Sequence, residues 1–396
     1  MDDQGTLHII PDLDQLIDER LPCDQSRIIS TNYSRMSTLE ACYGYKVLMI
    51  DFELVNTTTG EQWELYAVAK IVPNKSEIEK SYEIQTTFKK ELGLYMTARD
   101  SLNKFLKSKG QLNGIEIMPT PFGGRFNIDG SDTMDEHAVL IVSNLKKYGF
   151  RRFDKKRGFD LECSNTVLKA LAEFHGSALG LKINHPEEFE QNIKNHLTDS
   201  HSSRSRHKIT RDQMTEVLKE ESFSCEVIQK ATEIFDRRSI KNSREPWATI
   251  IHNNTKVDNI LIRFDKYDRP SAVKLIDFRL SEYQSPARDL LHFLFTSVQL
   301  DVLESHLDDL IDFYYHTLFN QLQKLDVDTW FFARWSFNEE LKVAASQSEF
   351  FKTVSTLNAT FSSNLDVSKG RVIDPMHRKR LCFLVKEFNR RDWLCL

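Results

Sequence analysis

Two polar side chains that could bind a metal ion stand at the ends of a predicted β-hairpin. The segment His252–Phe278 reads HNNTKVDNILIRFDKYDRPSAVKLIDF, and its apolar runs, Ile260–Phe264 and Ala272–Ile276, flank a polar turn. Because one antiparallel strand starts where the next one ends, we expect Asn259 and Asp277 to be neighbours. An amide oxygen beside a carboxylate suits Mg²⁺ and phosphate oxygens, although an ordinary hairpin with two polar ends explains the spacing equally well.

A lysine and a glutamate upstream could belong to the same site. Lys70 is the only cation in the predicted strand 63–72, and a lysine there either sits at a sheet edge with its ammonium in water or has a specific partner. A helix is predicted over Glu77–Leu102, and Glu91 lies beside its apolar stripe. This glutamate either reaches Lys70 or is solvated at the flank of the stripe. The stripe consists of Phe88, Leu92, Tyr95 and Met96.

The remaining pattern describes the elements that must position these side chains. A strand is predicted over Tyr45–Val55, with Leu48, Ile50, Phe52 and Leu54 on one face. A further strand is expected over Ala138–Val142, followed by a charged connector, and a short helix over Leu13–Leu21. The second half is predicted to be mostly helical, with a Ser/Arg/His-rich segment at 199–211 that is typical of a solvated surface loop.

Composition narrows the class of protein. The chain has 396 residues, 40% of them hydrophobic, and can therefore bury a large core. A net charge of −5 argues against general nucleic-acid binding, and the six scattered cysteines favour free thiols in a reducing compartment. The acidic N-terminus does not resemble a signal peptide, and no apolar run is long enough to cross a membrane. We therefore expect a cytoplasmic protein with no membrane or nucleic-acid partner.

Several motifs in order resemble one protein family. The chain reads LKALAEFHGSALGLK, then HNNTKVDNILIRF, then VKLIDFRLSEYQSPARDLLHFLFTSV. These segments resemble the LA-x-FH-A helix, the HGD-x-x-x-x-N loop, the LIDFQ strand end and the SPALDL-x-x-FLFTS segment of the ecdysteroid kinase-like group. These are CHK (choline-kinase-homologue) domain proteins, related to aminoglycoside phosphotransferases and choline kinases. The resemblance covers residues 45–330.

The resemblance implies an α+β, protein kinase-like bilobed fold. The small N-terminal lobe would hold an antiparallel sheet and one main helix, and the larger C-terminal lobe would be mostly helical. The implied domains are an N-terminal extension at 1–40, the nucleotide-binding lobe at 41–144, and a lobe at 145–396 with the catalytic loop, metal site and acceptor pocket. The implied cofactors are ATP and Mg²⁺. The implied substrate is a small hydroxylated molecule, such as a steroid-like alcohol.

Site roles also follow from the resemblance. Lys70 would hold the nucleotide phosphates, Glu91 would orient Lys70, and Leu145 would belong to the hinge behind the adenine. Asn259 and Asp277 would hold Mg²⁺. In the catalytic loop, His252 would be a structural support, and Asp289 would brace the loop from the helix below. The only glycine near the expected phosphate-covering loop is Gly44, and no phosphate contact is assigned there.

One position departs from the family pattern in a way that affects catalysis. Asn254 stands where the family has the aspartate that accepts the proton of the substrate hydroxyl, and Asn253 replaces the preceding glycine. An amide can accept a hydrogen bond but cannot take a proton at neutral pH. The sequence therefore predicts a kinase with slow turnover or, as the alternative, an impaired pseudokinase that binds nucleotide, ligand or a partner. Arg279, where the family often has glutamine, either contacts phosphate or sits in water.

Overall fold

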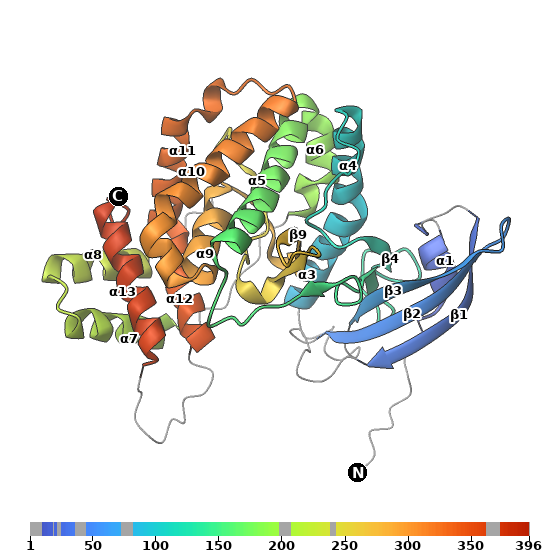
Figure 1. Ribbon diagram of the computed structural model, residues 1–396, viewed down its shortest axis with the longest axis horizontal. Helices are drawn as coiled ribbons and strands as arrows, with labels where there is room; N and C mark the ends of the chain where they lie inside the picture. Colours follow the sequence, from blue (N-terminus) through green and yellow to red (C-terminus); the bar gives the residue numbers. More distant parts are fainter. Residues whose placement is uncertain are drawn as a thin grey trace, which may run out of the picture.

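A five-stranded antiparallel sheet forms one end of the molecule (Figure 1). The computed structural model describes residues 10–18, 20–21, 25–35, 45–72, 82–197, 207–237, 243–361 and 373–395. The strand order is β1-β2-β3-β5-β4, and every neighbouring pair is antiparallel. The strands are β1 (Ser26–Arg35), β2 (Lys46–Asn56), β3 (Gln62–Ile71), β4 (Pro121–Arg125) and β5 (Val139–Ser143).

Alternating side chains explain why this sheet has one buried face. The predicted set Leu48, Ile50, Phe52 and Leu54 on β2 is buried, as strand geometry requires for residues two apart. Helix α1 (Leu13–Asp18) covers this face and contributes to the same hydrophobic cluster. The expected strands at 45–55, 63–72 and 138–142 and the short N-terminal helix are thus confirmed, with ends shifted by a few residues.

The N-terminal segment is more integrated than the sequence pattern suggests. Strand β1, which lies in the expected extension at 1–40, pairs with β2 along its length, and Ile28 stands opposite Leu54. Its residues are at most half-buried, so the strand lacks the strong apolar alternation that would have revealed it. The extension therefore contributes an edge strand to the sheet, while the domain limits at 41–144 and 145–396 stay predictions.

The main helix of the small lobe joins it to the rest of the molecule. It runs through α3 (Tyr82–Gly93), a π-helical turn η2 (Leu94–Ala98) and α4 (Arg99–Ser108), and so ends beyond the predicted Leu102. The predicted start at Glu77 lies outside the described residues. Phe88 and Tyr95 of the predicted stripe are buried, whereas Leu92 and Met96 are half-buried.

The larger lobe is mostly helical and contains two small sheets. One sheet has the order β6-β8-β9 and the other pairs β10 with β7. The strands are β6 (Phe150–Arg151), β7 (Thr249–Ile251), β8 (Ile260–Phe264), β9 (Pro270–Leu275) and β10 (Glu282–Gln284). The helices are α5 (Leu161–Asn184), α6 (Pro186–Asn192), α7 (His207–Glu220), α8 (Cys225–Asp236), α9 (Ala287–Ser297), α10 (Leu300–Lys324), α11 (Arg334–Ala344), α12 (Phe350–Phe361) and α13 (Pro375–Arg390).

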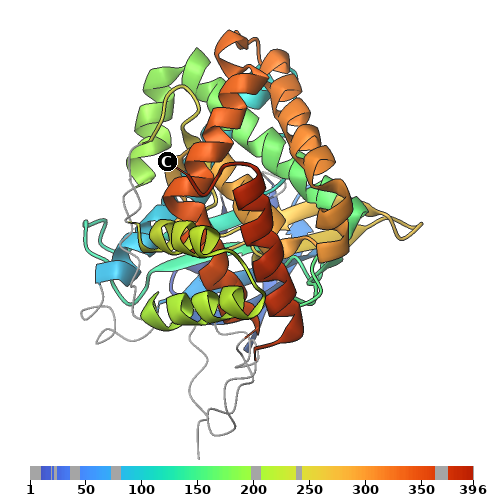
Figure 2. The same ribbon diagram turned by 90° about the vertical axis from the view of Figure 1, so that its left-hand side faces the viewer.

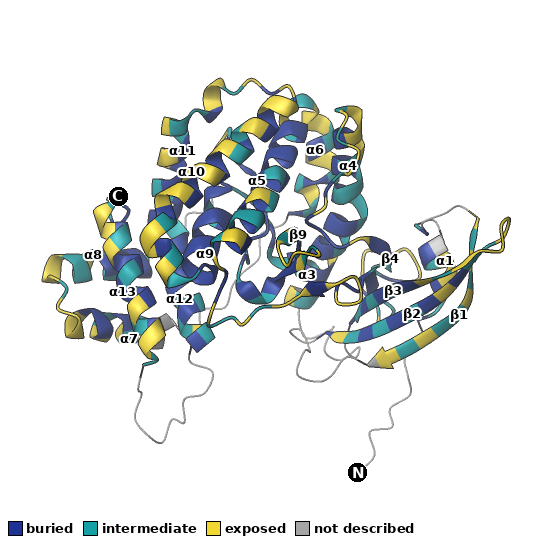
Figure 3. Cartoon of the chain, in the orientation of Figure 1, coloured by how far each residue is buried: buried dark blue, intermediate teal, exposed yellow. Residues whose placement is uncertain are grey.

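The core of this lobe surrounds α5 and α9. Helix α9 is buried along almost its whole length, and α5 packs against α10 (Figure 3). Helices α7, α8 and α13 pack together at the end of the molecule opposite the sheet (Figures 1 and 2). Helix α7 begins at His207, so the last residues of the predicted surface loop at 199–211 are helical. Residues 198–206 lie outside the described part.

The two lobes give the bilobed α+β architecture that the sequence predicts. Within the described residues, no helix combines the length and the apolar character needed to cross a bilayer. The cysteines in the described part, Cys163, Cys225, Cys382 and Cys395, are not in disulfides, as predicted.

Candidate functional site

Lys70 lies on a central strand of the sheet. Strand β3 has β2 on one side and β5 on the other, and Lys70 stands opposite Val47 and Leu140. The edge-strand explanation for this lysine is therefore wrong. Its side chain is 15% exposed, and its ammonium forms an ion pair with the Glu91 carboxylate and lies 4.2 Å from the centroid of the Tyr45 ring. The lysine has specific partners rather than a position in water.

Glu91 connects the sheet to the end of the hairpin. One oxygen of its carboxylate pairs with Lys70, and the other accepts a hydrogen bond of 3.1 Å from the backbone N–H of Phe278. Glu91 is only 3% exposed, which excludes the alternative of a solvated glutamate. A single buried carboxylate thus fixes the position of the lysine relative to the residue that follows Asp277.

The charge of Lys70 is maintained by these acids. Burial by itself lowers the pKa of Lys70, but the carboxylates of Glu91 and Asp277 outweigh burial and raise the pKa above its ordinary value. The Asp277 oxygen Oδ1 lies 3.9 Å from the lysine Nζ. The lysine is therefore a permanent cation that faces the end of the hairpin.

The hairpin brings Asn259 and Asp277 to the same end. Ile260 pairs with Leu275, and the N–H of Ile276 donates to the carbonyl of Asn259 at 3.0 Å, so Asp277 is the next residue along. Asp277 has a left-handed backbone (φ 69°, ψ 61°), which turns the chain out of the strand. The Asn259 amide nitrogen donates to the backbone carbonyl of Asn254 at 2.9 Å, which leaves its amide oxygen as an acceptor.

Asp289 holds the loop that carries Asn254. Its carboxylate accepts hydrogen bonds from the backbone N–H groups of His252 (2.6 Å) and Asn253 (2.8 Å), and from the ring of His175 (3.3 Å). Burial alone would raise the pKa of Asp289, but the hydrogen bond from His175 and the nearby positive charges hold it well below its ordinary range. Asp289 thus makes the contacts that the predicted bracing role requires.

His252 connects the loop to the end of the hairpin. Its ring nitrogen Nε2 lies 2.9 Å from the carbonyl oxygen of Ile276, and its ring packs edge-on against Phe278 at 4.6 Å between centroids. Burial lowers the pKa of His252, so the ring is neutral and Nε2 carries the proton that it donates. This contact joins the loop to the strand that ends at Asp277, as a structural role demands.

Asn253 and Asn254 form the turn of this loop, and Asn253 is buried. Asn253 has φ 60°, a left-handed conformation in which asparagine replaces glycine at low cost. Its amide donates to the Leu280 carbonyl and its oxygen accepts from the Lys352 ammonium at 2.6 Å. Asn254 is half-buried. Lys352 could not be identified from the sequence, because a lysine on an amphipathic helix normally faces solvent.

Two further predicted residues complete the picture. Leu145 is 7% exposed and clusters with Phe150 and Leu261, so it lies against the hairpin that carries the acid. Arg279 does not sit in water, since its Nε lies 2.9 Å from Asp277 Oδ1 and its side chain is 13% exposed. Lys70, Glu91, Asp277 and Arg279 are therefore gathered at one place, and their catalytic roles stay predictions.

The donors at this place suit a magnesium ion that is bound mainly through phosphates. One carboxylate and one amide oxygen are available from Asp277 and Asn259, and Mg²⁺ in nucleotide sites commonly takes one or two carboxylates plus phosphate oxygens and water. In the described part of the chain, no cluster of three or more His, Cys, Asp or Glu side chains could hold a metal by itself. The residues thus fit a metal that arrives with a nucleotide.

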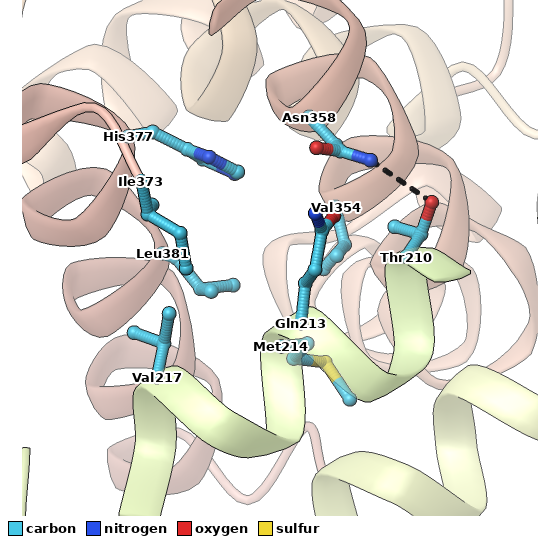
Figure 4. Close-up of a pocket in the computed structure, with 9 residues that line it drawn as sticks. All are labelled: Thr210, Gln213, Met214, Val217, Val354, Asn358, Ile373, His377 and Leu381. Atoms are coloured by element: carbon cyan, nitrogen blue, oxygen red, sulfur yellow. Dashed lines mark hydrogen bonds between the residues drawn. The ribbon is translucent and has the colours of Figure 1, made fainter. Parts of the chain in front are cut away.

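Two small cavities lie elsewhere in the helical lobe. The first is lined by residues of α7, α12 and α13, among them His377, and Figure 4 marks the hydrogen bond of 3.0 Å that Asn358 donates to Thr210. The second lies where α11 meets the start of α9, and its lining includes Arg288 and Glu340. Neither lining includes a predicted site residue, so they do not identify the acceptor pocket.

Comparisons with known proteins place the chain in a family. The sequence model of the ecdysteroid kinase-like family matches residues 41–327, more than two thirds of the chain. No curated protein matches the sequence significantly.

Similar solved structures include three phosphotransferase-type proteins. The GDP complex of aminoglycoside 2′-phosphotransferase-IIIa is 13% identical, with 96% of this chain and 97% of that chain covered and a TM-score of 0.40. A macrolide 2′-phosphotransferase from Brachybacterium faecium is 8% identical (90% and 92% covered, TM-score 0.36). A choline/ethanolamine kinase family protein from Mesorhizobium loti is 10% identical (92% and 92% covered, TM-score 0.36). By the family match, which agrees with the motifs at His252–Asn259 and Leu275–Ser297, this chain belongs to the ecdysteroid kinase-like family.

Proposed function

We propose that this protein is an ATP- and Mg²⁺-dependent phosphotransferase that moves the γ-phosphate of ATP to a hydroxyl group of a small, steroid-like alcohol. One observation carries the proposal. A buried carboxylate, Glu91, holds the Lys70 ammonium with one oxygen and the N–H of Phe278 with the other, which fixes a cation beside Asp277. A fixed cation and a carboxylate at one point are what phosphate handling needs.

Each residue has a defined task in this proposal. Lys70 neutralises charge on the nucleotide phosphates, and Glu91 keeps its ammonium in place. Asn259 and Asp277 hold Mg²⁺, which neutralises phosphate charge when bound. Leu145 forms part of the apolar surface beside the hairpin, where an adenine would pack.

The acceptor side depends on Asn254. Its backbone carbonyl accepts hydrogen bonds from the N–H of Lys256 and the amide of Asn259, both 2.9 Å, so the loop backbone is held in place at this residue. The amide oxygen can accept a hydrogen bond from the acceptor hydroxyl and align it. It cannot remove the proton, and general-base assistance is worth roughly 10²–10⁴ in rate. We therefore propose slow transfer, which relies on positioning and charge neutralisation.

A second candidate function has a specific observation in its favour. Asn254 removes the proton acceptor, and Arg279 already occupies one oxygen of Asp277. Both changes are compatible with a pseudokinase that binds nucleotide or a small hydroxylated ligand without turnover. The two candidates share the nucleotide site and differ in phosphate transfer.

The test is a transfer assay with radiolabelled ATP and Mg²⁺ across hydroxylated steroids, other lipophilic alcohols and amino alcohols. We expect acceptor-dependent product from the wild type and a loss of roughly 10²–10³-fold in Lys70→Met, because a fixed charge at the phosphates disappears. Lys147→Met is the control, because this lysine is 46% exposed and contacts only the outside of the sheet, through an ion pair with Asp51 and the ring of Tyr66. Equal activity of Lys70→Met and wild type would contradict the site.

Thermal-shift titration separates the two candidates. Stabilisation by ATP without transfer to any acceptor favours the pseudokinase, whereas no stabilisation by ATP in any condition contradicts the nucleotide site that the two candidates share.

A further inference from the structure

Arg279 is part of the site rather than a surface residue. It follows Asp277 and Phe278 in the short 3-10 turn Phe278–Leu280, and its Nε lies 2.9 Å from Asp277 Oδ1. Both side chains are nearly buried, at 13% and 11% exposure. An ion pair with so little solvent is screened far less than one on the surface. The guanidinium is therefore an effective charge at the carboxylate that is predicted to hold the metal.

The same carboxylate oxygen faces a second cation. Asp277 Oδ1 lies 3.9 Å from the Lys70 ammonium as well as 2.9 Å from Arg279. Burial raises the pKa values of Tyr45 and Glu91, and Arg279 is among the cations that act against burial at both. The guanidinium charge is thus felt by the surrounding groups and not only by its ion-pair partner.

The charges at this point balance without a metal ion. Lys70 and Arg279 each carry one positive charge, and Glu91 and Asp277 each carry one negative charge. With glutamine at position 279, the same four positions would carry a net charge of −1. In this chain a polyphosphate therefore binds at a site with no net charge. With glutamine at position 279 the site would be negative and would require a divalent ion to neutralise it.

The backbone leaves little freedom to separate these charges. Asp277 is held in its left-handed conformation because the next N–H, that of Phe278, is bonded to buried Glu91. The 3-10 turn is closed by the N–H of Ser281 on the carbonyl of Phe278. A divalent ion that coordinates Asp277 Oδ1 would consequently stand beside a guanidinium of like charge, and the two would compete for this oxygen.

We propose that Arg279 is a built-in counter-cation of Asp277, which takes over part of the charge neutralisation supplied by a divalent ion and makes nucleotide binding only weakly dependent on Mg²⁺. This inference rests on the nucleotide site of the proposed function. The planar guanidinium offers several N–H donors, so when a triphosphate enters it can keep Asp277 and also donate to a phosphate oxygen. The price is weaker binding of the metal itself.

The experiment is calorimetric titration of the full-length protein with a non-hydrolysable ATP analogue, once in EDTA and once in excess Mg²⁺. For the wild type we expect the two dissociation constants to differ by less than about tenfold. For Arg279→Gln we expect at least about tenfold weaker binding in EDTA and recovery in Mg²⁺, because the site regains its negative charge. A tenfold change corresponds to about 1.4 kcal/mol.

Two variants make the result specific. Arg269→Gln lies on the same hairpin, is 63% exposed and pairs with Asp265, so it should behave as wild type. Arg279→Lys keeps the charge and should keep binding in EDTA. As an independent readout, Mn²⁺ titration followed by electron paramagnetic resonance, in the presence of the analogue, should show tighter Mn²⁺ binding to Arg279→Gln than to wild type.

The possible failures can be told apart. An equal ratio of EDTA and Mg²⁺ dissociation constants in wild type and Arg279→Gln overturns the role of Arg279 and leaves the nucleotide site intact. Equal Mn²⁺ affinity in the two proteins overturns the competition for Asp277. Absence of nucleotide binding in either condition, for every variant, overturns this inference together with the proposed function.

Discussion

The substitution Asn254→Asp tests whether one missing proton acceptor limits this protein. Asparagine and aspartate have almost the same shape, and the loop backbone is fixed independently of the side chain. The Asn254 carbonyl accepts from Lys256 and Asn259, and Asp289 holds the two preceding N–H groups. The change therefore introduces a carboxylate without rebuilding the loop.

The expected gain follows from the chemistry and the surroundings of the loop. A positioned general base contributes roughly 10²–10⁴ in rate, or about 3–5 kcal/mol. The position is half-buried, and the Lys352 ammonium contacts the neighbouring residue Asn253. Even if repulsion from other acids raised the new pKa by about two units from about 3.9, the group would be ionised at pH 7.5. We expect transfer to be faster by at least about tenfold.

The assay is single-turnover transfer from labelled ATP to one permissive acceptor, with nucleotide affinity measured on the same preparations. Asn254→Ala is the matched control, because it removes the amide without adding a base, and it should be no faster than wild type. The reasoning is refuted if Asn254→Asp is no faster while its nucleotide affinity stays within about twofold of wild type. That outcome would mean that proton removal does not limit transfer in this loop.

Two further predictions concern the stability of the helical lobe. Asp289→Asn should lower the free energy of unfolding, measured by urea titration, by about 3 kcal/mol, because a buried carboxylate that accepts from two N–H groups and His175 is lost. The control is Asp268→Asn, since the Asp268 side chain is 85% exposed. A loss below about 1 kcal/mol, or one equal to that of the control, would contradict the bracing role. Burial lowers the pKa of His377 from 6.5 to about 4, so between these two pH values the ring is protonated in the unfolded chain and neutral in the folded protein. The contribution of this neutral ring to the free energy of unfolding is fully present above pH 6.5. It is lost as the pH falls towards 4, by up to about 3 kcal/mol. In thermal melts between pH 6.5 and pH 4, the melting temperature of His377→Leu should fall less than that of the wild type. An equal fall in both proteins would show that other groups cause the pH dependence.

Much of the fold follows from local pattern. Alternation with a period of two placed Leu48, Ile50, Phe52 and Leu54 on one buried face, and the turn chemistry after Phe264 located the hairpin. Strand β1 was missed because its residues are at most half-buried, and the helix that begins at His207 was missed because its polar first turn is typical of a loop. These failures occur where neighbours elsewhere in the chain, rather than local hydrophobicity, stabilise the element.

The candidate site shows the same division. Residue types and motif order identified the candidate site residues Lys70, Glu91, Asn259, Asp277 and Asp289. Whether Lys70 and Glu91 are solvated or buried with a partner could not be decided from the sequence, because residue type alone does not show whether a charged side chain is exposed or buried. The structure decides them by placing both charges in the interior, where each requires a partner.

The sequence by itself determined the order of the parts: a strand lysine, a helix glutamate, a loop with Asn254 and an acid at the end of a strand. Periodicity and motifs are local properties, which is why they can be read directly. Only the tertiary structure decided which charges meet. Glu91 bonds to a residue 187 positions away, Lys352 reaches Asn253 across 99 positions, and Arg279 turns towards Asp277. Such contacts depend on how elements that are distant in sequence pack against one another, and their partners therefore have no fixed spacing along the chain.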